Sequence, residues 1–172
     1  MQIVFETPRL ILRKFTPEDA PLILQLNRDP EVIKYVHEPV IENEEQASDI
    51  IENIIIPQYQ NNLGRWAIHL KSNNEFIGWC GLKYLADKNE TDLGYRLQQI
   101  YWGQGFATEA AIHTLSYGFQ SLQLKVITGK AHAQNLASIN VLNKIGMTFK
   151  AKEIEDGSLI KVFNLKNPFL LE

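Results

Sequence analysis

Residues 101–111 (YWGQGFATEAA) constrain the fold more than any other part of the chain. They follow an alternating apolar and polar segment, residues 92–98, which is typical of a strand. They precede residues 112–122, whose apolar side chains fall on one face of a helix. A strand, a glycine-containing turn and a helix, in that order, leave free backbone N–H groups at the positive end of a helix dipole, which favours phosphate. Gly103 and Gly105 permit backbone angles that a side chain would penalise, and they let a ligand approach the main chain.

Two nucleotide-binding motifs do not fit this loop. A dinucleotide fingerprint needs Gly or Ala at the position that Thr108 occupies. A P-loop needs Lys and Ser or Thr after its second glycine, whereas Phe106 follows Gly105 here. The loop therefore predicts a phosphate ligand of another kind.

The loop resembles the pyrophosphate loop of the GNAT superfamily of acyl-CoA-dependent N-acyltransferases, whose motif is [R/Q]-x-x-G-x-[G/A]. Here the motif begins at Trp102, which departs from the Arg or Gln of the family, and ends at Ala107. The longer pattern W-G-x-G-[FY]-A-T-E-A is similar to the RimJ/RimL branch, which acetylates the N-termini of ribosomal proteins. Four further segments resemble that branch in the same order, so the resemblance covers nearly the whole chain: residues 6–13 (ETPRLILR), 76–82 (FIGWCGL), 92–97 (DLGYRL) and 135–147 (NLAS to KIGM).

Composition is that of one globular domain spanning residues 1–172, with 45% hydrophobic and 22% charged residues. No apolar run approaches the ~20 residues of a membrane span, and the first residues lack the pattern of a secretory signal. Cys80, the single cysteine, excludes an internal disulfide framework and fits a reducing compartment. We therefore expect a cytoplasmic protein without a membrane partner.

The charge and the histidine content narrow the classes of possible partner further. The net charge of −3 argues against a nucleic-acid partner, which would require a basic surface. Four scattered histidines and one cysteine have no metal-ligand spacing, so no metal is expected. A homodimer remains an alternative to a monomer.

Periodicity and turn signals predict an α+β fold. The strand–helix–strand unit at residues 91–132 would be parallel and the rest of the sheet antiparallel. The resemblance implies a GNAT-like mixed sheet, mostly antiparallel, whose parallel strand pair is splayed and whose two faces carry helices. Helices are expected to start near Thr16, Asp29, Asn43, Phe106 and Asn135. Strands are expected at residues 9–14, 66–71, 75–84, 91–98, 125–132, 147–155 and 158–166.

The resemblance implies acetyl-CoA as co-substrate. Backbone edges of Leu97 and Gln99 would face the splayed strand and bond to the pantetheine amides. Asn135 would contact the cofactor from a helix N-cap with Ser138 at N3, or serve as a cap alone. Lys144 would reach the nucleotide end of CoA or remain a solvated surface residue. The pyrophosphate would be held by the amides of the loop: Gly103, Gln104, Gly105, Phe106, Ala107 and Thr108.

Two residues are candidates for catalysis by direct attack of the amine on the thioester. Asp92 matches the acidic residue of the family's strand motif and would accept the amine proton, directly or through water, unless it is a strand-end turn residue. Many family members place a Tyr four residues before the glycine of the last helix, a position that Leu142 occupies here. Ser138 is the hydroxyl that the ribosomal branch offers instead to protonate the departing thiolate. Cys80 is expected to be a small core residue rather than a nucleophile.

The acceptor is predicted to be a protein N-terminal amine. A small-molecule amine (an amino sugar, a polyamine or an antibiotic) and a non-catalytic CoA-binding regulator are the alternatives. The three tryptophans, Trp66, Trp79 and Trp102, are expected to serve in packing rather than in substrate stacking, with Trp66 the best candidate for a pocket wall. Glu109 is expected to interact with the helix N-terminus. An acidic segment without Lys or Arg predicts either a mouth for a cationic acceptor or a solvated helix face: Glu38, Glu42, Glu44, Glu45, Asp49 and Glu52.

Overall fold

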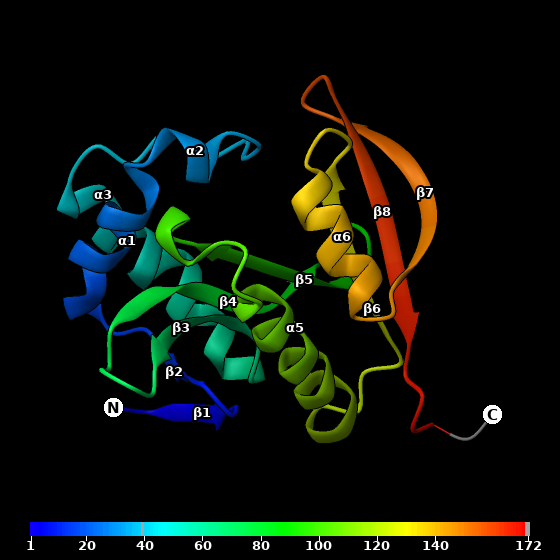
Figure 1. The fold of residues 1–172 in the computed structure, drawn as a ribbon, viewed down its shortest axis with the longest axis horizontal. Helices are drawn as coiled ribbons and strands as arrows, with labels where there is room; N and C mark the ends of the chain where they lie inside the picture. The colour runs from blue at the N-terminus through cyan, green and yellow to red at the C-terminus, as the bar shows by residue number, and fades with distance from the viewer. Residues whose placement is uncertain (39, 171–172) are drawn as a thin grey trace.

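The computed structural model describes residues 1–38 and 40–170, whose strands form one eight-stranded sheet flanked by helices (Figure 1). The strand order across the sheet is β1-β2-β3-β4-β5-β6-β8-β7. The sequence predicts seven of these strands and misses β1, whose four residues are too few for a period to be read. The strand bounds are β1 Ile3–Glu6, β2 Leu10–Lys14, β3 Gly64–Leu70, β4 Phe76–Leu85, β5 Glu90–Leu97, β6 Val126–His132, β7 Thr148–Glu155 and β8 Ser158–Lys166.

β5 and β6 run parallel, and the other neighbouring strands in the described part of the chain run antiparallel. The β5–β6 register covers only Asp92↔Thr128 and Leu93↔Gly129. Beyond these pairs the two strands diverge, while β5 stays bonded to β4 and β6 stays bonded to β8. This confirms the prediction of a mixed sheet with one splayed parallel pair.

One face of the sheet is covered by α5 (Phe106–Ser116) and α6 (Leu136–Lys144), which lie side by side in Figure 1. A π-helical turn, η5 (Tyr117–Ser121), continues α5. Leu115 of α5 and Leu142 of α6 pack in the same core as Leu93 of β5. These contacts bury the apolar faces of both helices and hold their N-termini beside the splayed strands.

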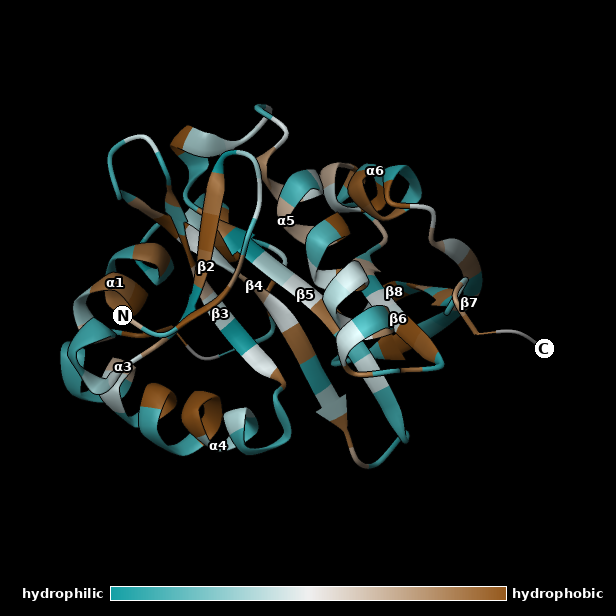
Figure 2. Cartoon of the chain, turned by 90° about the horizontal axis from the view of Figure 1, so that it is seen from below, coloured by the Kyte–Doolittle hydropathy of each residue, from teal (hydrophilic) through white to brown (hydrophobic). Residues whose placement is uncertain are grey.

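The N-terminal helices cover the opposite face and enclose a second core, which includes Ile23, Ile51 and Trp79. Bands of brown and teal alternate along α1 and along the continuous segment of α3, η2 and α4 in Figure 2, as expected for helical segments with one buried face. Within the described ranges, no helix is long and apolar enough to cross a membrane. The helical segments on this face are η1 Pro17–Asp19, α1 Ala20–Asn27, α2 Pro30–Ile33, α3 Glu44–Ile50, η2 Ile51–Ile55, α4 Ile56–Gln58 and η3 Tyr59–Asn61.

Local sequence signals explain several element boundaries. Asn43 caps α3, because its side-chain oxygen accepts a hydrogen bond from the Gln46 amide at 2.9 Å. Gly146 follows α6 with a φ of +87°, the left-handed conformation that ends many helices. Asp156 and Gly157 both have positive φ and form the tight turn between β7 and β8. All three features were expected from the sequence.

Candidate active site

The diverging ends of β5 and β6 form a V-shaped opening in the sheet. Successive side chains of β5 point to opposite faces. Leu93, Tyr95 and Leu97 face α5 and α6, whereas Asp92 and Arg96 face the side of α1. Past Leu93, the facing edges of the two described strands have no ladder partner in each other. Such edges can be satisfied by a ligand that carries amide groups.

The predicted phosphate loop lies at the N-terminus of α5. Gly103 and Gly105 have φ values of +71° and +80°, which only glycine adopts readily. The amide of Glu109 donates to the Gly105 carbonyl at 3.0 Å, the first bond of the helical ladder. The amides of residues 106–108 therefore precede that ladder and are the donors that a helix N-terminus offers to an anion.

Arg9 links this loop to the start of β2, and the sequence did not predict it as a site residue. Its guanidinium lies 2.6 Å from the Glu109 carboxylate and donates to the Gln104 carbonyl at 3.1 Å. The same guanidinium stacks on the Phe106 ring at 4.3 Å. The signal was present, since Arg9 belongs to the ETPRLILR segment of the family resemblance. Arg9 adds a cation beside the loop where the resemblance places a pyrophosphate.

Glu109 lies in the first turn of α5, as expected, and also contacts the start of β2. Its carboxylate accepts hydrogen bonds from the Thr7 hydroxyl at 2.6 Å and from the Arg9 amide at 2.9 Å. Burial raises the Glu109 pKa, but the bonds from Thr7 and Arg9 outweigh it and hold the pKa below its usual value. Glu109 therefore ties the start of β2 to the start of α5, instead of acting only on the helix dipole.

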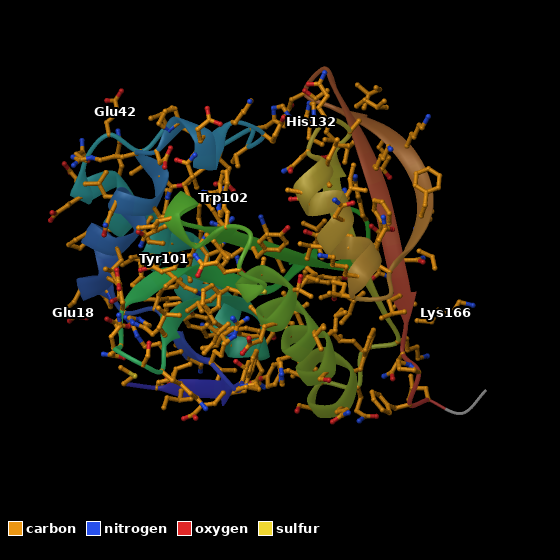
Figure 3. All side chains as sticks on the ribbon, in the orientation of Figure 1. Glu18, Glu42, Tyr101, Trp102, His132 and Lys166 are labelled. Atoms are coloured by element: carbon orange, nitrogen blue, oxygen red, sulfur yellow. The ribbon has the colours of Figure 1, made fainter. Side chains whose placement is uncertain are left out.

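Leu97 and Gln99 occupy different environments. Leu97 is buried at the end of β5, and its carbonyl accepts a hydrogen bond from Trp102 Nε1 at 2.9 Å. The expected strand-edge position of Gln99 is wrong, because the chain leaves β5 after Leu97 and forms the short turn η4 (Gln99–Tyr101). The Gln99 carbonyl accepts from the Trp102 amide at 3.0 Å. Trp102, labelled in Figure 3 beside Tyr101, therefore closes this turn. Pantetheine contacts of Leu97 and Gln99 stay predictions.

α6 brings Asn135 and Ser138 to the α5 side of the V. Asn135 caps the helix, and its side-chain oxygen accepts from the Ser138 amide at 3.2 Å. Ser138 is not isolated, because the Tyr95 hydroxyl donates to its Oγ at 3.2 Å. Tyr95 was not predicted as a site residue, although strand alternation places it on this face. Lys144 lies exposed at the other end of α6, so its contact with the nucleotide stays a prediction.

Asp92 lies within β5 and lines a cavity on the α1 side of the sheet, so it is not a strand-end turn residue. Its Oδ1 is buried and has no hydrogen-bond partner among the described residues. Burial raises the pKa of Asp92 to about 7, against the opposing effect of the Lys130 cation. A carboxylate with this pKa can accept a proton at neutral pH.

The cavity that Asp92 lines measures about 570 Å³. β3 to β6 form its floor, and the segment after α2, including Tyr35 and Glu38, forms part of its wall. The ring of Tyr35 lies 5.0 Å from that of His132, which Figure 3 labels at the end of β6. This contact joins the N-terminal segment to the far arm of the V, so the cavity has walls from both halves of the sheet.

The structure decides between the alternatives for two features of the acceptor side. Trp66 is 1% exposed and packs against Phe5 and Tyr117 in the α5-side core, so it is not a pocket wall. Of the acidic segment, only Glu38 is among the described residues that line the cavity, and two guanidiniums bind its carboxylate. The other five side chains are exposed near or on α3 and η2, which is the solvated-face alternative: Glu42, Glu44, Glu45, Asp49 and Glu52.

Cys80 offers no nucleophile. It is fully buried on β4, and its Sγ lies 3.3 Å from the Thr114 hydroxyl. Burial raises the pKa of the Cys80 thiol to about 12, so the thiolate is scarce at neutral pH. In the described part of the chain, no group of three or more His, Cys, Asp or Glu residues could hold a metal ion.

The residues present fit coenzyme A. The loop amides and Arg9 can bind a pyrophosphate, and the strand edges of the V can bind a chain with two amides. The Asp92 carboxyl lies on one face of the sheet, and the hydroxyls of Tyr95 and Ser138 lie on the other. Fold and site together define an acyltransferase that uses an acyl-CoA.

Comparison with known proteins identifies the family. Residues 9–148 match the family model described as an acetyltransferase (GNAT) domain. The protein named uncharacterized N-acetyltransferase p20 of Bacillus licheniformis is 36% identical over 162 residues, which are 91% of each chain. The chain belongs to the GNAT acetyltransferase family. It is an N-acetyltransferase that depends on acetyl-CoA.

Solved structures agree on the fold. RimL, a ribosomal L7/L12 α-N-protein acetyltransferase in complex with coenzyme A, superposes with a TM-score of 0.83. It is 16% identical, and the match covers 96% of this chain and 98% of that one. A spermidine N-acetyltransferase from Vibrio cholerae, in complex with CoA and spermine, has a TM-score of 0.78 and 18% identity, over 92% and 95% of the two chains. At these identities the likeness shows the fold alone.

Proposed function

We propose that this enzyme acetylates an α-amine at the N-terminus of a polypeptide. The amine would enter the cavity on the α1 side of the sheet and meet the acetyl group in the V. Asp92 carries this proposal, because its unpartnered oxygen and its pKa of about 7 provide a base at that point of the cavity.

The remaining site residues have separate tasks in this proposal. Bound acetyl-CoA would supply an acetyl thioester. The amides of residues 106–108 and the Arg9 guanidinium bind its pyrophosphate. Asp92 accepts the proton that the amine loses. Ser138 Oγ donates a proton to the thiolate that leaves, and Tyr95 donates its hydrogen bond to that same oxygen.

Proton affinity favours an α-amine over a lysine or polyamine nitrogen. An α-amine with a pKa of ~7.7–8.0 is partly neutral at pH 7, whereas an alkyl amine near ~10.4 is almost fully protonated. A base with a pKa of about 7 is matched to the first and far below the second. Carboxylates and cations are also nearly balanced around the cavity, so a polycation gains little attraction there: Glu38, Asp87, Asp92, Glu155 and Asp156 against Arg65, Lys83, Lys88 and Lys130.

A panel of acceptors tests the proposal. Release of the CoA thiol and the mass of the product would be measured with N-terminal peptides, spermidine and an amino sugar, using the same enzyme preparation. We expect turnover on peptides with a free α-amine and none on peptides with a blocked N-terminus. Turnover on spermidine or the amino sugar alone would support the small-molecule alternative. CoA binding without turnover on any acceptor would support the regulator.

A further inference from the structure

Two arginines share a single carboxylate at the edge of the acceptor cavity. Arg65 Nη2 lies 3.0 Å from Glu38 Oε1, and Arg96 Nη2 lies 3.2 Å from Glu38 Oε2. Among the described residues, neither guanidinium forms an ion pair with a second carboxylate. The cluster therefore carries one more positive than negative charge.

The two guanidiniums are held in place by the sheet. They lie 4.8 Å and 5.5 Å from the centre of the Trp79 ring, with Arg65 on β3 and Arg96 on β5. Arg96 also donates a hydrogen bond to the side chain of Asn27 on α1. Their side chains are only 14% and 9% exposed. Fixed, desolvated guanidiniums that converge on one point form a strong carboxylate site.

The carboxylate is the less constrained partner. Glu38 is 45% exposed and comes from the segment after α2, outside any helix or strand. Burial raises the Glu38 pKa, but the two guanidiniums outweigh it and hold the pKa below its usual value. Glu38 is therefore an anion at neutral pH. It can leave the arginines without disturbing the pairing of β3, β4 and β5.

We propose that the Arg65–Arg96 pair binds a carboxylate carried by the acceptor, and that Glu38 holds the place this carboxylate takes. The inference rests on the proposed acetyl transfer to an amine in this cavity, and it names the substrate class: an amine accompanied by a carboxylate. One cavity is lined by Glu38, Arg65 and Asp92. The amine and the carboxylate of a single molecule can therefore both bind in it. The carboxylate has two sources, an acidic side chain near a peptide N-terminus or the α-carboxylate of a free amino acid.

Matched acceptors separate the two sources. One pair is a peptide with Ser-Glu or Ser-Gln at its N-terminus, and the other is serine or serine amide. For the wild type, we expect kcat/KM to favour the acidic member of at least one pair by about tenfold to a hundredfold, the range of a charged hydrogen-bonded contact. Preference in the first pair identifies the peptide, and preference in the second identifies the amino acid.

Variants test the assignment to these residues. Arg65→Gln should abolish the preference, and Glu38→Gln should increase it by lowering KM for the acidic acceptor, because the competing anion is gone. Opposite effects of these two substitutions on the preference distinguish a binding site from a structural ion pair. Removing either partner of a structural ion pair would change the preference in the same direction. Arg28→Gln, at an exposed position on the C-cap of α1, is the matched control and should retain the preference. If Arg65→Gln does not fold, Arg65→Lys, which keeps the charge, is tested in its place.

Equal kcat/KM within both pairs, or an unchanged preference in Arg65→Gln, would overturn the inference and leave the acetyltransferase proposal standing. If no acceptor is acetylated, the proposed function fails instead. Calorimetry of the same acceptors with the CoA-loaded protein then decides the inference. Tighter binding of the acidic member, lost in Arg65→Gln, supports it, and equal binding refutes it.

Discussion

The hydroxyl of Tyr95 donates a hydrogen bond to Ser138 Oγ over 3.2 Å, and so joins β5 to α6 across the mouth of the V. Burial raises the pKa of Tyr95, so the phenol keeps its proton at neutral pH. Ser138 therefore has a neighbour that can restore a proton it gives away. The position that carries a Tyr in many relatives is Leu142, which is buried in the core and offers no hydroxyl.

This pair predicts a non-additive loss of rate. Ser138→Ala should lower kcat by about tenfold to a hundredfold, near the low end for general acid catalysis, because a thiolate is a good leaving group. Tyr95→Phe should lower kcat by a similar factor, and the double variant should be no worse than Ser138→Ala alone. CoA affinity, measured by calorimetry, should change little in all three.

Tyr84→Phe is the control, since its exposed hydroxyl bonds to Asn89 away from the V. A wild-type rate in Ser138→Ala would show that the thiolate leaves unaided or takes its proton from water. If the factors by which the single substitutions lower kcat multiply in the double variant, the two hydroxyls do not act together.

Gly105 should be required for CoA binding. Its φ of +80° is strained for any β-branched residue, whereas an added Cβ would meet only the end of the Arg9 side chain at 3.4 Å. Gly105→Val should therefore remain folded but lose CoA affinity, because relief of the strain moves the loop amides. Gly157→Val introduces the same strain at the β7–β8 turn, at a φ of +77°, and should bind CoA normally. Calorimetry that finds normal CoA affinity in a folded Gly105→Val refutes the loop assignment.

The sequence predicted those parts of the molecule that local chemistry determines. The phosphate loop needed only its glycines and the following helix, and the cap at Asn135 needed only its own side chain. The contacts of Tyr95 and Arg9 were not predicted, because their partners lie 43 and 100 residues away along the chain. No period or spacing encodes such pairs, and they depend on how β5, β2 and the helices pack.

The charge of the acceptor cavity also depends on contacts between distant parts of the chain. Counting along the chain left two alternatives, an acidic mouth or a solvated helix face, since residues 38–52 carry six carboxylates and no cation. The fold spreads five of them over exposed positions and brings Arg65 and Arg96 to the sixth. The charge density of one segment therefore does not give the charge of the cavity, because strands from other parts of the chain supply the facing cations.

Asp92→Asn should raise the stability of the fold and lower the rate of acetyl transfer. The folded-state pKa of about 7 lies above the ~3.9 of an unfolded Asp, so folding favours the protonated form. That contribution is complete below the unfolded pKa and is lost as pH rises through 7. We therefore expect Asp92→Asn to raise Tm, and to do so more at pH 8 than at pH 5. Asp49→Asn, exposed on α3, is the control.

The rate effect of Asp92→Asn follows from the same pKa. The wild type should lose kcat/KM on an α-amine peptide as pH falls through about 7, when Asp92 becomes protonated. Asp92→Asn should lower kcat by about tenfold to a hundredfold at pH 7, because an α-amine is already partly neutral. Its remaining pH dependence should follow the amine alone. An unchanged profile would assign the base to another group or to water.

Arg9→Gln should weaken CoA binding. The substitution removes the ion pair with Glu109 and the bond to the Gln104 carbonyl, so the loop loses its tie to β2. Arg9 is half exposed, and we expect a loss in CoA affinity of only about threefold to tenfold. Lys71→Gln removes another ion pair at this side of the sheet, with Glu6, and should leave CoA affinity unchanged. Calorimetry of CoA binding to both variants tests this prediction.

The site of acetylation on a peptide that carries both an α-amine and a lysine side chain tests the central claim most directly. The peptide would be incubated with enzyme and acetyl-CoA at pH 7, and the modified nitrogen located by fragmentation mass spectrometry. The account predicts one acetyl group on the α-amine, formed more slowly by Asp92→Asn. Acetylation of the lysine side chain, or none at all while spermidine is acetylated, would contradict it.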